Sequence, residues 1–286
     1  PCVIEQTPFA QLWRAGREIV AAPLDCATRT RLLNTLYGGN FTLNELDEGD
    51  GHFRIKTIGE NIAVTPGKVM YQNDLMQLIQ YEPITEQVYK TPMLLIPAWI
   101  NKYYIFDLTA ERSFIHWLTE KGYSVFVVSW VNPDEKLGRK GFEDYLKEGP
   151  LAALDVIEHI SGSKQTSIIG YCLGGTLTSI ALSYLQSIGE DKRVASVTYL
   201  TTLVDFKDAG EISVFIDDTQ LEALENRMSE RGYLDASEMA TTFNMLRAND
   251  LIWSFVVNNY LMGKDPFPFD LLYWNADATR MPAAIH

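Results

Sequence analysis

The chain has 286 residues, of which 47% are hydrophobic and 21% charged, and its formal net charge at pH 7 is −13. This composition is typical of a globular protein and excludes the disordered and collagen-like classes. The acidic balance argues against nucleic acid as the main partner, because phosphate binding needs a basic surface. No apolar run reaches the roughly 18 residues that span a bilayer, so we expect no transmembrane segment.

The first 51 residues lack a regular alternation of strands and helices. Their pattern predicts helices over 9–21 and 28–37, followed by a loop rich in Gly, Asn, Asp and Glu. We therefore expect an N-terminal helical region over 1–51. Beyond it, the short alternating runs at 53–56 and 69–71 predict antiparallel strands.

After Pro92, short apolar runs alternate with helical segments. The predicted order is strand 93–97, helix 110–121, strand 124–128, helix 141–160, strand 166–169, helix 174–187 and strand 194–200. Unbroken apolar runs are typical of strands buried on both faces, and their alternation with helices predicts a helix-covered parallel sheet. We expect an α/β core over 52–204.

Beyond Asp205 this alternation stops. Residues 212–260 have the pattern of helices and loops without a further buried strand. A helical insertion over the carboxyl edge of the sheet would explain this change. We expect a cap or lid insertion over 205–286.

The sequence Gly170-Tyr171-Cys172-Leu173-Gly174-Gly175 links a predicted strand to a predicted helix. This is the pattern of the nucleophile elbow of α/β-hydrolase folds, with cysteine in place of serine. Gly170 and Gly174 keep the flanking positions small, so that strand and helix can pass closely. The helix N-terminus favours a thiolate at Cys172, and the backbone N–H of Leu173 is the expected oxyanion donor. A buried structural cysteine is the competing interpretation.

A second oxyanion donor is expected in the loop after strand 93–97. We expect the backbone N–H of Trp99 to fill this role, with Ala98 or Ile100 as the alternatives. The competing interpretation is an aromatic loop that packs on the core. Lys102 is a candidate for binding a phosphate, although a structural role suits it as well.

The catalytic base and acid are harder to find. In this fold the acid and the histidine follow the nucleophile, whereas His52, His116 and His159 precede Cys172. His286 is the last residue, and Asp205 qualifies as the acid by position alone. We therefore expect that the catalytic Asp and His are not in this chain. Together with the absence of an initial methionine, this indicates a fragment, truncated within the cap insertion.

The three cysteines have no spacing typical of a disulfide framework or a zinc site. They are Cys2, Cys26 and Cys172. We expect a reducing, cytoplasmic compartment, no metal and no cofactor.

Several segments resemble the poly(3-hydroxyalkanoate) synthases. They are Pro97-Ala98-Trp99-Ile100-Asn101-Lys102-Tyr103-Tyr104-Ile105-Phe106-Asp107-Leu108, the runs 126–134, 170–175 and 200–206, and the tracts 249–253 and 269–275. The resemblance covers most of the chain from about residue 62 and is to the class I and II enzymes. It implies an α/β-hydrolase fold and an enzyme that polymerises (R)-3-hydroxyacyl groups from coenzyme A thioesters.

The resemblance also implies roles and partners. Cys172 would carry the acyl group as a thioester, while a later histidine and aspartate, with no matching position here, would act as base and hydroxyl activator. Expected partners are the (R)-3-hydroxyacyl-CoA substrate, a polyester granule surface and, for the full-length protein, a second copy.

Two alternatives remain. One is a thioesterase or polyester hydrolase of the same fold, which the cysteine disfavours. The other is a non-catalytic fragment that binds granules through apolar cap residues. The candidates for such binding are Phe215, Phe255, Val256, Val257, Leu261, Phe267 and Phe269.

Overall fold

The computed structural model describes residues 58–60, 62–207, 210, 217–239, 253–254, 256–263, 274, 277 and 279–285. The helical region predicted over 1–51 lies outside the described residues. So do the strand predicted at 53–56, two of the four histidines (His52 and His286) and four of the apolar cap candidates. These four are Phe215, Phe255, Phe267 and Phe269.

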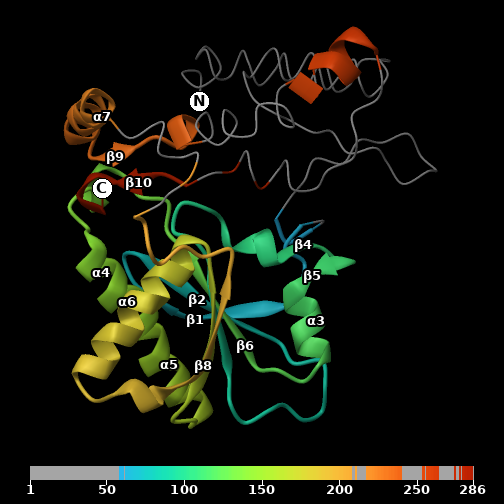
Figure 1. The fold of residues 1–286 in the computed structure, drawn as a ribbon. Helices are drawn as coiled ribbons and strands as arrows, with labels where there is room; N and C mark the ends of the chain where they lie inside the picture. The colour runs from blue at the N-terminus through green and yellow to red at the C-terminus, as the bar shows by residue number, and fades with distance from the viewer. Residues whose placement is uncertain are drawn as a thin grey trace, which may run out of the picture.

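A six-stranded sheet forms the centre of the molecule, in the order β1-β2-β6-β3-β7-β8 (Figure 1). Its strands are β1 (Gly67–Gln72), β2 (Met76–Tyr81), β3 (Met93–Ile96), β6 (Val125–Trp130), β7 (Thr166–Tyr171) and β8 (Val194–Leu200). The hairpin β1–β2 joins β6 in antiparallel fashion, whereas β6, β3, β7 and β8 run parallel. A mostly parallel sheet of this order confirms the predicted α/β-hydrolase fold.

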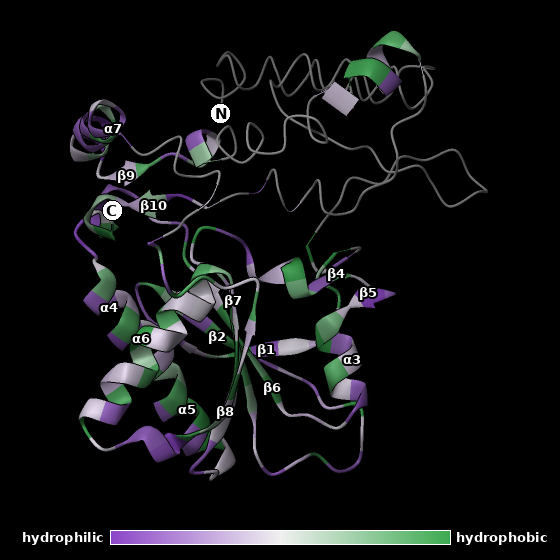
Figure 2. Ribbon diagram, in the orientation of Figure 1, coloured by the Kyte–Doolittle hydropathy of each residue, from purple (hydrophilic) through white to green (hydrophobic). Residues whose placement is uncertain are grey.

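Helices cover both faces of the sheet. α3 (Phe114–Glu120) lies on one face, and α4 (Phe142–Leu146), α5 (Ala152–Ser161) and α6 (Leu173–Ser187) lie on the other (Figure 1). Leu94 and Ile96 of β3 belong to the core under α4–α6, while Leu95 belongs to the core under α3. Successive side chains of a strand point to opposite faces, so an unbroken apolar run feeds both cores. Figure 2 shows the resulting hydrophobic colouring of the central strands.

Two predicted helices differ in extent from the structure. The helix predicted from residue 110 begins at Phe114, because 107–113 form a small hairpin of β4 (Asp107–Thr109) and β5 (Arg112–Ser113). The Ser113 Oγ accepts a hydrogen bond from the backbone N–H of His116 at 2.9 Å and caps the helix. The helix predicted over 141–160 is interrupted by a π-helical segment, η4 (Lys147–Leu151), which contains Pro150.

The remaining elements are short, apart from α7 (Asp218–Arg231). They are η2 (Tyr103–Phe106), η3 (Glu135–Leu137), η5 (Asp191–Arg193), β9 (Tyr233–Leu234), η8 (Val256–Leu261), β10 (Met281–Pro282) and η9 (Ala283–Ile285). β9 pairs with β10, a short strand pair that the helical pattern of 212–260 does not indicate. Among the described residues, no helix is both long and apolar enough to cross a membrane. The domain boundaries at 51 and 204 stay predictions.

Candidate active site

Cys172 occupies the sharp turn between β7 and α6. It is the N-cap residue of α6, and its backbone angles are φ 53° and ψ −126°. The Cys172 N–H donates to the Leu200 carbonyl oxygen of β8 at 2.9 Å, and the Gly175 N–H donates to the Cys172 carbonyl oxygen at 2.9 Å. A positive φ is unfavourable for a residue with a side chain, and these bonds hold it in place. This is the backbone expected of a nucleophile elbow.

Three glycines make the turn sterically possible. A Cβ on Gly174 would lie 2.1 Å from the Ile96 carbonyl oxygen, and one on Gly170 would lie 2.5 Å from the Gly175 Cα. Both positions were predicted from the sequence. Gly175, which the sequence argument did not single out, is equally constrained, because its Cβ would lie 2.1 Å from the Thr202 Oγ1. The glycines therefore allow the start of α6 to lie close to the ends of β3, β7 and β8.

The Cys172 thiol is half-buried, and its burial raises its pKa above the usual cysteine value. A hydrogen bond from the backbone N–H of Leu173 acts in the opposite direction and lowers the pKa. The sequence predicts a thiolate favoured by the helix N-terminus, but neither the hydrogen bond from Leu173 to the sulfur nor the opposing effect of burial. Since burial dominates, the thiol is protonated at neutral pH and needs a base before it can attack.

The loop after β3 runs beside the start of α6. The Pro97 carbonyl oxygen lies 2.6 Å from the place of a Gly174 Cβ, and it accepts a hydrogen bond from the Trp130 Nε1 at 2.8 Å. Trp99 is 2% exposed, and its ring lies 5.6 Å from that of Phe142 and 5.9 Å from that of Tyr145. The loop thus lies at the elbow, and the oxyanion roles of Leu173 and Trp99 stay predictions.

A segment near the end of the chain lies against this loop. The Thr279 N–H donates to the Ile100 carbonyl oxygen at 2.9 Å, and the Trp274 Nε1 donates to the Lys102 carbonyl oxygen at 2.8 Å. The buried Tyr104 donates its hydroxyl to the Asp277 Oδ2 at 2.7 Å. No local pattern in the sequence indicates this contact, because the partners are far apart in the chain.

Lys102 also takes part in this contact. Its Nζ lies 3.9 Å from the Asp277 Oδ1, so a carboxylate already faces the ammonium group. This supports the structural role for Lys102 over the phosphate-binding one.

The described histidines have partners or positions unrelated to Cys172. His116 lies on α3, where its Nε2 is 3.3 Å from the Glu120 Oε1 at the surface. His159 lies near the end of α5, which leads into the start of β7, whereas Cys172 follows the end of β7. Asp205 is exposed and accepts a hydrogen bond from the Lys207 N–H at 3.0 Å. Neither histidine nor Asp205 is placed as the base or acid of Cys172.

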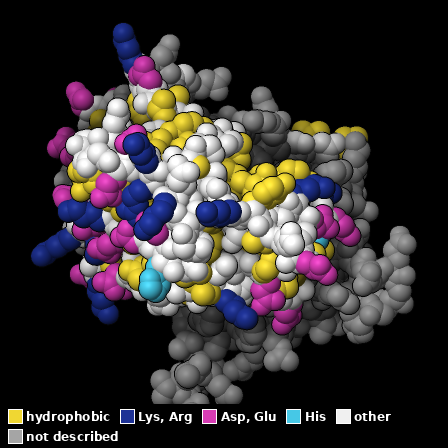
Figure 3. Space-filling view, turned by 90° about the horizontal axis from the view of Figure 1, so that it is seen from below, with side chains coloured by type: hydrophobic (Ala, Val, Ile, Leu, Met, Phe, Trp, Pro, Cys, Tyr) yellow, Lys and Arg dark blue, Asp and Glu magenta, His cyan; other side chains and the backbone are white. Residues whose placement is uncertain are grey.

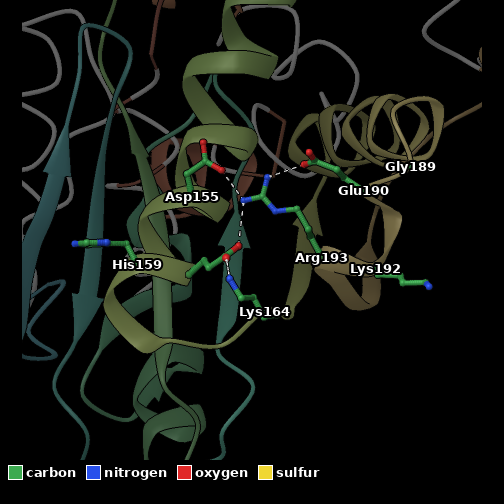
Figure 4. Close-up of a pocket in the computed structure, with 8 residues that line it drawn as sticks. Asp155, His159, Lys164, Gly189, Glu190, Lys192 and Arg193 are labelled. Atoms are coloured by element: carbon green, nitrogen blue, oxygen red, sulfur yellow. Dashed lines mark hydrogen bonds and ion pairs between the residues drawn. The ribbon is translucent and has the colours of Figure 1, made fainter.

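A charged pocket lies where α5 meets the connection between α6 and β8 (Figure 4). Arg193 lies at its centre, with Nη2 2.5 Å from the Asp155 Oδ1 and Nη1 3.2 Å from the Glu190 Oε2. Figure 4 shows His159 pointing away from Arg193. Arg193 is already paired with carboxylates, so the pocket offers no free positive charge to an anion. Its ion pairs instead link α5 to the connection between α6 and β8.

Figure 3 shows the molecule from below, with Lys, Arg, Asp and Glu side chains interspersed over the surface. On this face, mixed charge of this kind is typical of a solvated surface.

The sequence of this chain is similar to known proteins of one kind. The sequence model "Poly-beta-hydroxybutyrate polymerase (PhaC) N-terminus" matches residues 30–118. A poly(3-hydroxyalkanoate) polymerase of Methylorubrum extorquens is 51% identical over 88% of this chain and 43% of its own length. A poly(3-hydroxyalkanoate) polymerase subunit of Rhizobium meliloti is 51% identical over 88% of this chain and 42% of its own length.

Solved structures are less similar. A sugar hydrolase from Lactococcus lactis shares 13% sequence identity, covers 55% of this chain and 62% of its own, and has a TM-score of 0.38. The fold class therefore rests on the strand order and on the turn at Cys172. The chain spans less than half the length of the curated relatives it matches. Over most of its own length, this chain is similar to the poly(3-hydroxyalkanoate) polymerases, which confirms the family resemblance of its sequence.

Proposed function

We propose that the protein is an acyltransferase that polymerises (R)-3-hydroxyacyl groups from coenzyme A thioesters into a polyhydroxyalkanoate. Cys172 is the proposed nucleophile. The observation that carries this proposal is the position of Cys172 at the turn into α6, with a positive φ and the Leu173 N–H beside its sulfur. The similarity to named poly(3-hydroxyalkanoate) polymerases supports the choice of substrate.

The proposed reaction has two steps. The Cys172 thiol loses its proton to a base, and the sulfur attacks the carbonyl carbon of the acyl-CoA thioester. The bond from carbon to the coenzyme A sulfur breaks, and coenzyme A leaves as a thiol with that proton. The hydroxyl of another unit then attacks the Cys172 thioester, so that an ester forms and the cysteine thiol is released. A cysteine suits both steps, since it is a good nucleophile and a good leaving group.

The base is not found among the described residues. The raised pKa of Cys172 makes it necessary, and the resemblance assigns the base to a histidine and hydroxyl activation to an aspartate. We place both outside these 286 residues, which agrees with the greater length of the relatives. On their own, the 286 residues are then expected to be inactive.

The resemblance also supports proposals about the setting of the reaction. We place the complete protein in the cytoplasm, as a homodimer at the surface of polyester granules. The proposed chemistry needs no cofactor, because the coenzyme A thioester supplies its own leaving group.

The proposal is tested by Cys172→Ala in the complete protein, with (R)-3-hydroxybutyryl-CoA as substrate. Removing the nucleophile should lower both coenzyme A release and polymer formation by at least about 1,000-fold. Ser183→Ala, at an exposed position of α6, is the matched control and should leave both rates unchanged. Continued polymerisation by Cys172→Ala would refute the role of Cys172.

The same assay distinguishes the proposed polymerase from a hydrolase of the same fold. A thioesterase would release coenzyme A from the unsubstituted protein and yield free hydroxy acid without polymer. A polymerase converts the acyl groups into polyester.

Granule binding is a second candidate function for these residues. The exposed apolar side chains of η8 favour it, since Val257 is 44% and Leu261 68% exposed. Co-sedimentation of the 286-residue chain with polyester granules tests this, with Val257→Ser/Leu261→Ser as the comparison. A chain that stays in the supernatant, or binding that the double substitution leaves unchanged, would count against it.

A further inference from the structure

Three consecutive backbone N–H groups in the loop after β3 have no hydrogen-bond acceptor in the part of the chain that the structure describes. They belong to Ala98, Trp99 and Ile100, which are 0%, 2% and 3% exposed. Buried backbone N–H groups in native proteins are almost always paired, so three adjacent unpaired ones require an explanation. Such groups are suited to bonding an oxygen atom on which negative charge develops during a reaction.

The loop lies against the first turn of α6, the helix that Cys172 caps. A Cβ on Gly174 would lie 2.6 Å from the Pro97 carbonyl oxygen, so helix and loop are in close contact. The three buried residues of the loop also belong to the same hydrophobic cluster as Cys172. The position of the loop therefore sets how far its N–H groups lie from a thioester held at Cys172.

Trp130, at the end of β6, fixes one end of this loop. Its side chain is buried, and its Nε1 donates to the Pro97 carbonyl oxygen at 2.8 Å. A trans peptide group is planar, with its carbonyl oxygen and the following N–H pointing in opposite directions. The bond to Pro97 therefore also sets the direction of the Ala98 N–H, the first of the three unpaired donors. At the other end of the loop, the Ile100 carbonyl oxygen accepts from the Thr279 N–H at 2.9 Å.

The indole ring of Trp130 is itself held in place by η4. A Cβ on Gly149 would lie 2.5 Å from the Trp130 Cη2 and 3.0 Å from its Cζ3, so the ring packs directly on the backbone of this π-helical segment. The ring of Tyr145 lies 5.2 Å away. Because Gly149 has no side chain, the indole can occupy the place from which its N–H reaches Pro97. A π-helical segment inside a helix is frequently found at a functional site.

We propose that Trp130 is a positioning residue for the acylation of Cys172. It holds the loop after β3 against the elbow, so that the free N–H groups of the loop bond the thioester oxygen as that oxygen gains negative charge. This inference rests on the proposed function of Cys172 and adds to it a residue that acts through the loop. Misplacing a group by about 1 Å can slow a reaction about 100-fold, so the support of the loop matters to the rate.

The first test compares Trp130→Phe with the unsubstituted complete protein. Two rates are measured at the same pH: the first-turnover release of coenzyme A from (R)-3-hydroxybutyryl-CoA, and the alkylation of Cys172 by iodoacetamide, followed by mass spectrometry of its peptide. Attack on the thioester creates an oxyanion, whereas alkylation displaces iodide and creates none. The substitution should slow acylation roughly 10- to 100-fold and leave alkylation unchanged.

Trp117→Phe is the matched control for this substitution. It makes the same change at a tryptophan of α3 that is 48% exposed, and it should alter neither rate. Equal slowing of acylation and alkylation by Trp130→Phe would show that Trp130 supports the elbow as a whole. An unchanged acylation rate would show that the loop keeps its place without Trp130. Either result would overturn the inference.

The second test uses Gly149→Ala, which leaves the indole N–H present. The new Cβ must displace the ring of Trp130, so acylation should slow while alkylation stays unchanged. The atoms that this Cβ would meet belong to the six-membered ring of the indole, and the shorter side chain of phenylalanine does not extend as far. In the Trp130→Phe background, Gly149→Ala should therefore slow acylation no further. Equal slowing in both backgrounds would mean that Gly149 acts independently of the ring, which contradicts the inference.

Failure of the proposed function gives a different result from failure of this inference. If Cys172 is not the nucleophile, the unsubstituted complete protein forms no acyl thioester at Cys172 in the first turnover. If only the inference fails, the unsubstituted protein is acylated at Cys172 and Trp130→Phe is acylated at the same rate.

Discussion

At Cys172, the geometry of the turn favours a thiolate, whereas burial of the side chain favours the protonated thiol. The turn directs a backbone N–H at the sulfur, which stabilises a thiolate, yet burial of the side chain raises the pKa more than that bond lowers it. The elbow thus prepares the position of the nucleophile but leaves its activation to a base.

The raised pKa predicts the pH dependence of alkylation of Cys172 in the 286-residue chain. Only the thiolate reacts with iodoacetamide, and a higher pKa moves its formation to higher pH. The rate should therefore keep rising beyond about pH 8.5, where an ordinary cysteine is half ionised. Mass spectrometry of the peptide that contains Cys172 measures this rate, with free cysteine as the control. A rate that levelled off at lower pH would contradict the prediction.

Gly174 is the residue at which the elbow tolerates least change. In Gly174→Ala the new Cβ would lie 2.1 Å from the Ile96 carbonyl oxygen, so β3 or α6 must shift. We expect a loss of about 1–3 kcal/mol in the free energy of unfolding, measured by urea denaturation.

Gly141→Ala is the matched control for this substitution. Its Cβ would lie 3.4 Å from the Ala284 carbonyl oxygen, which is an ordinary contact, and the loss should stay under about 1 kcal/mol. Equal losses in the two variants would mean that the close approach at Gly174 relaxes without cost.

At the scale of elements, the sequence predicts what is local. β3 and β6 appear in it as apolar runs, β7 and β8 as runs that mix apolar residues with Ser and Thr, and the turn at Cys172 is a continuous strand–glycine–helix segment. The π-helical segment η4 was missed, because it depends on tertiary packing: a Cβ on Gly149 would lie 2.5 Å from the Trp130 ring. Asp277 and Thr279 were missed for the same reason, since their partners in the loop after β3 lie more than a hundred residues earlier.

β4 is anchored by a buried carboxylate. Asp107 is 0% exposed, and it accepts from the Thr65 N–H at 3.1 Å and from the Thr65 Oγ1 at 2.6 Å. In Asp107→Asn the negative charge is lost, so the bonds that the Thr65 N–H and hydroxyl donate to a carboxylate are replaced by weaker bonds to a neutral amide. We expect the free energy of unfolding to fall by about 1–3 kcal/mol in urea denaturation.

Asp205→Asn is the comparison for this change. Asp205 is exposed and bonds only a nearby backbone N–H, so the same substitution should cost less than about 0.5 kcal/mol. Similar losses at both positions would show that the Thr65 bonds contribute nothing to the stability of β4.

For the whole molecule, the end of the described chain ties several loops together over the candidate site. The Arg280 N–H donates to the Asn132 Oδ1 at 3.0 Å after β6, and the Ala284 N–H donates to the Gly138 carbonyl oxygen at 3.0 Å. The Thr279 N–H reaches the loop after β3. Because both loops follow the carboxyl ends of strands, these bonds close the edge of the sheet where Cys172 lies.

Asp277 makes two side-chain contacts that hold this closing segment to the loop after β3. It accepts a hydrogen bond from the buried Tyr104 hydroxyl at 2.7 Å and faces the Lys102 Nζ at 3.9 Å. Asp277→Ala removes the acceptor of a buried donor, so the free energy of unfolding should fall by about 1–3 kcal/mol.

The closing segment should also open more often than the rest of the fold, because its bonds to the loop are few. Limited proteolysis should therefore cut near residues 274–285 faster than in the unsubstituted protein, while cleavage in the sheet is unchanged. Glu225→Ala, at an exposed position of α7, should change neither quantity, and an unchanged cleavage rate in Asp277→Ala would show that Thr279 and Arg280 hold the segment without it.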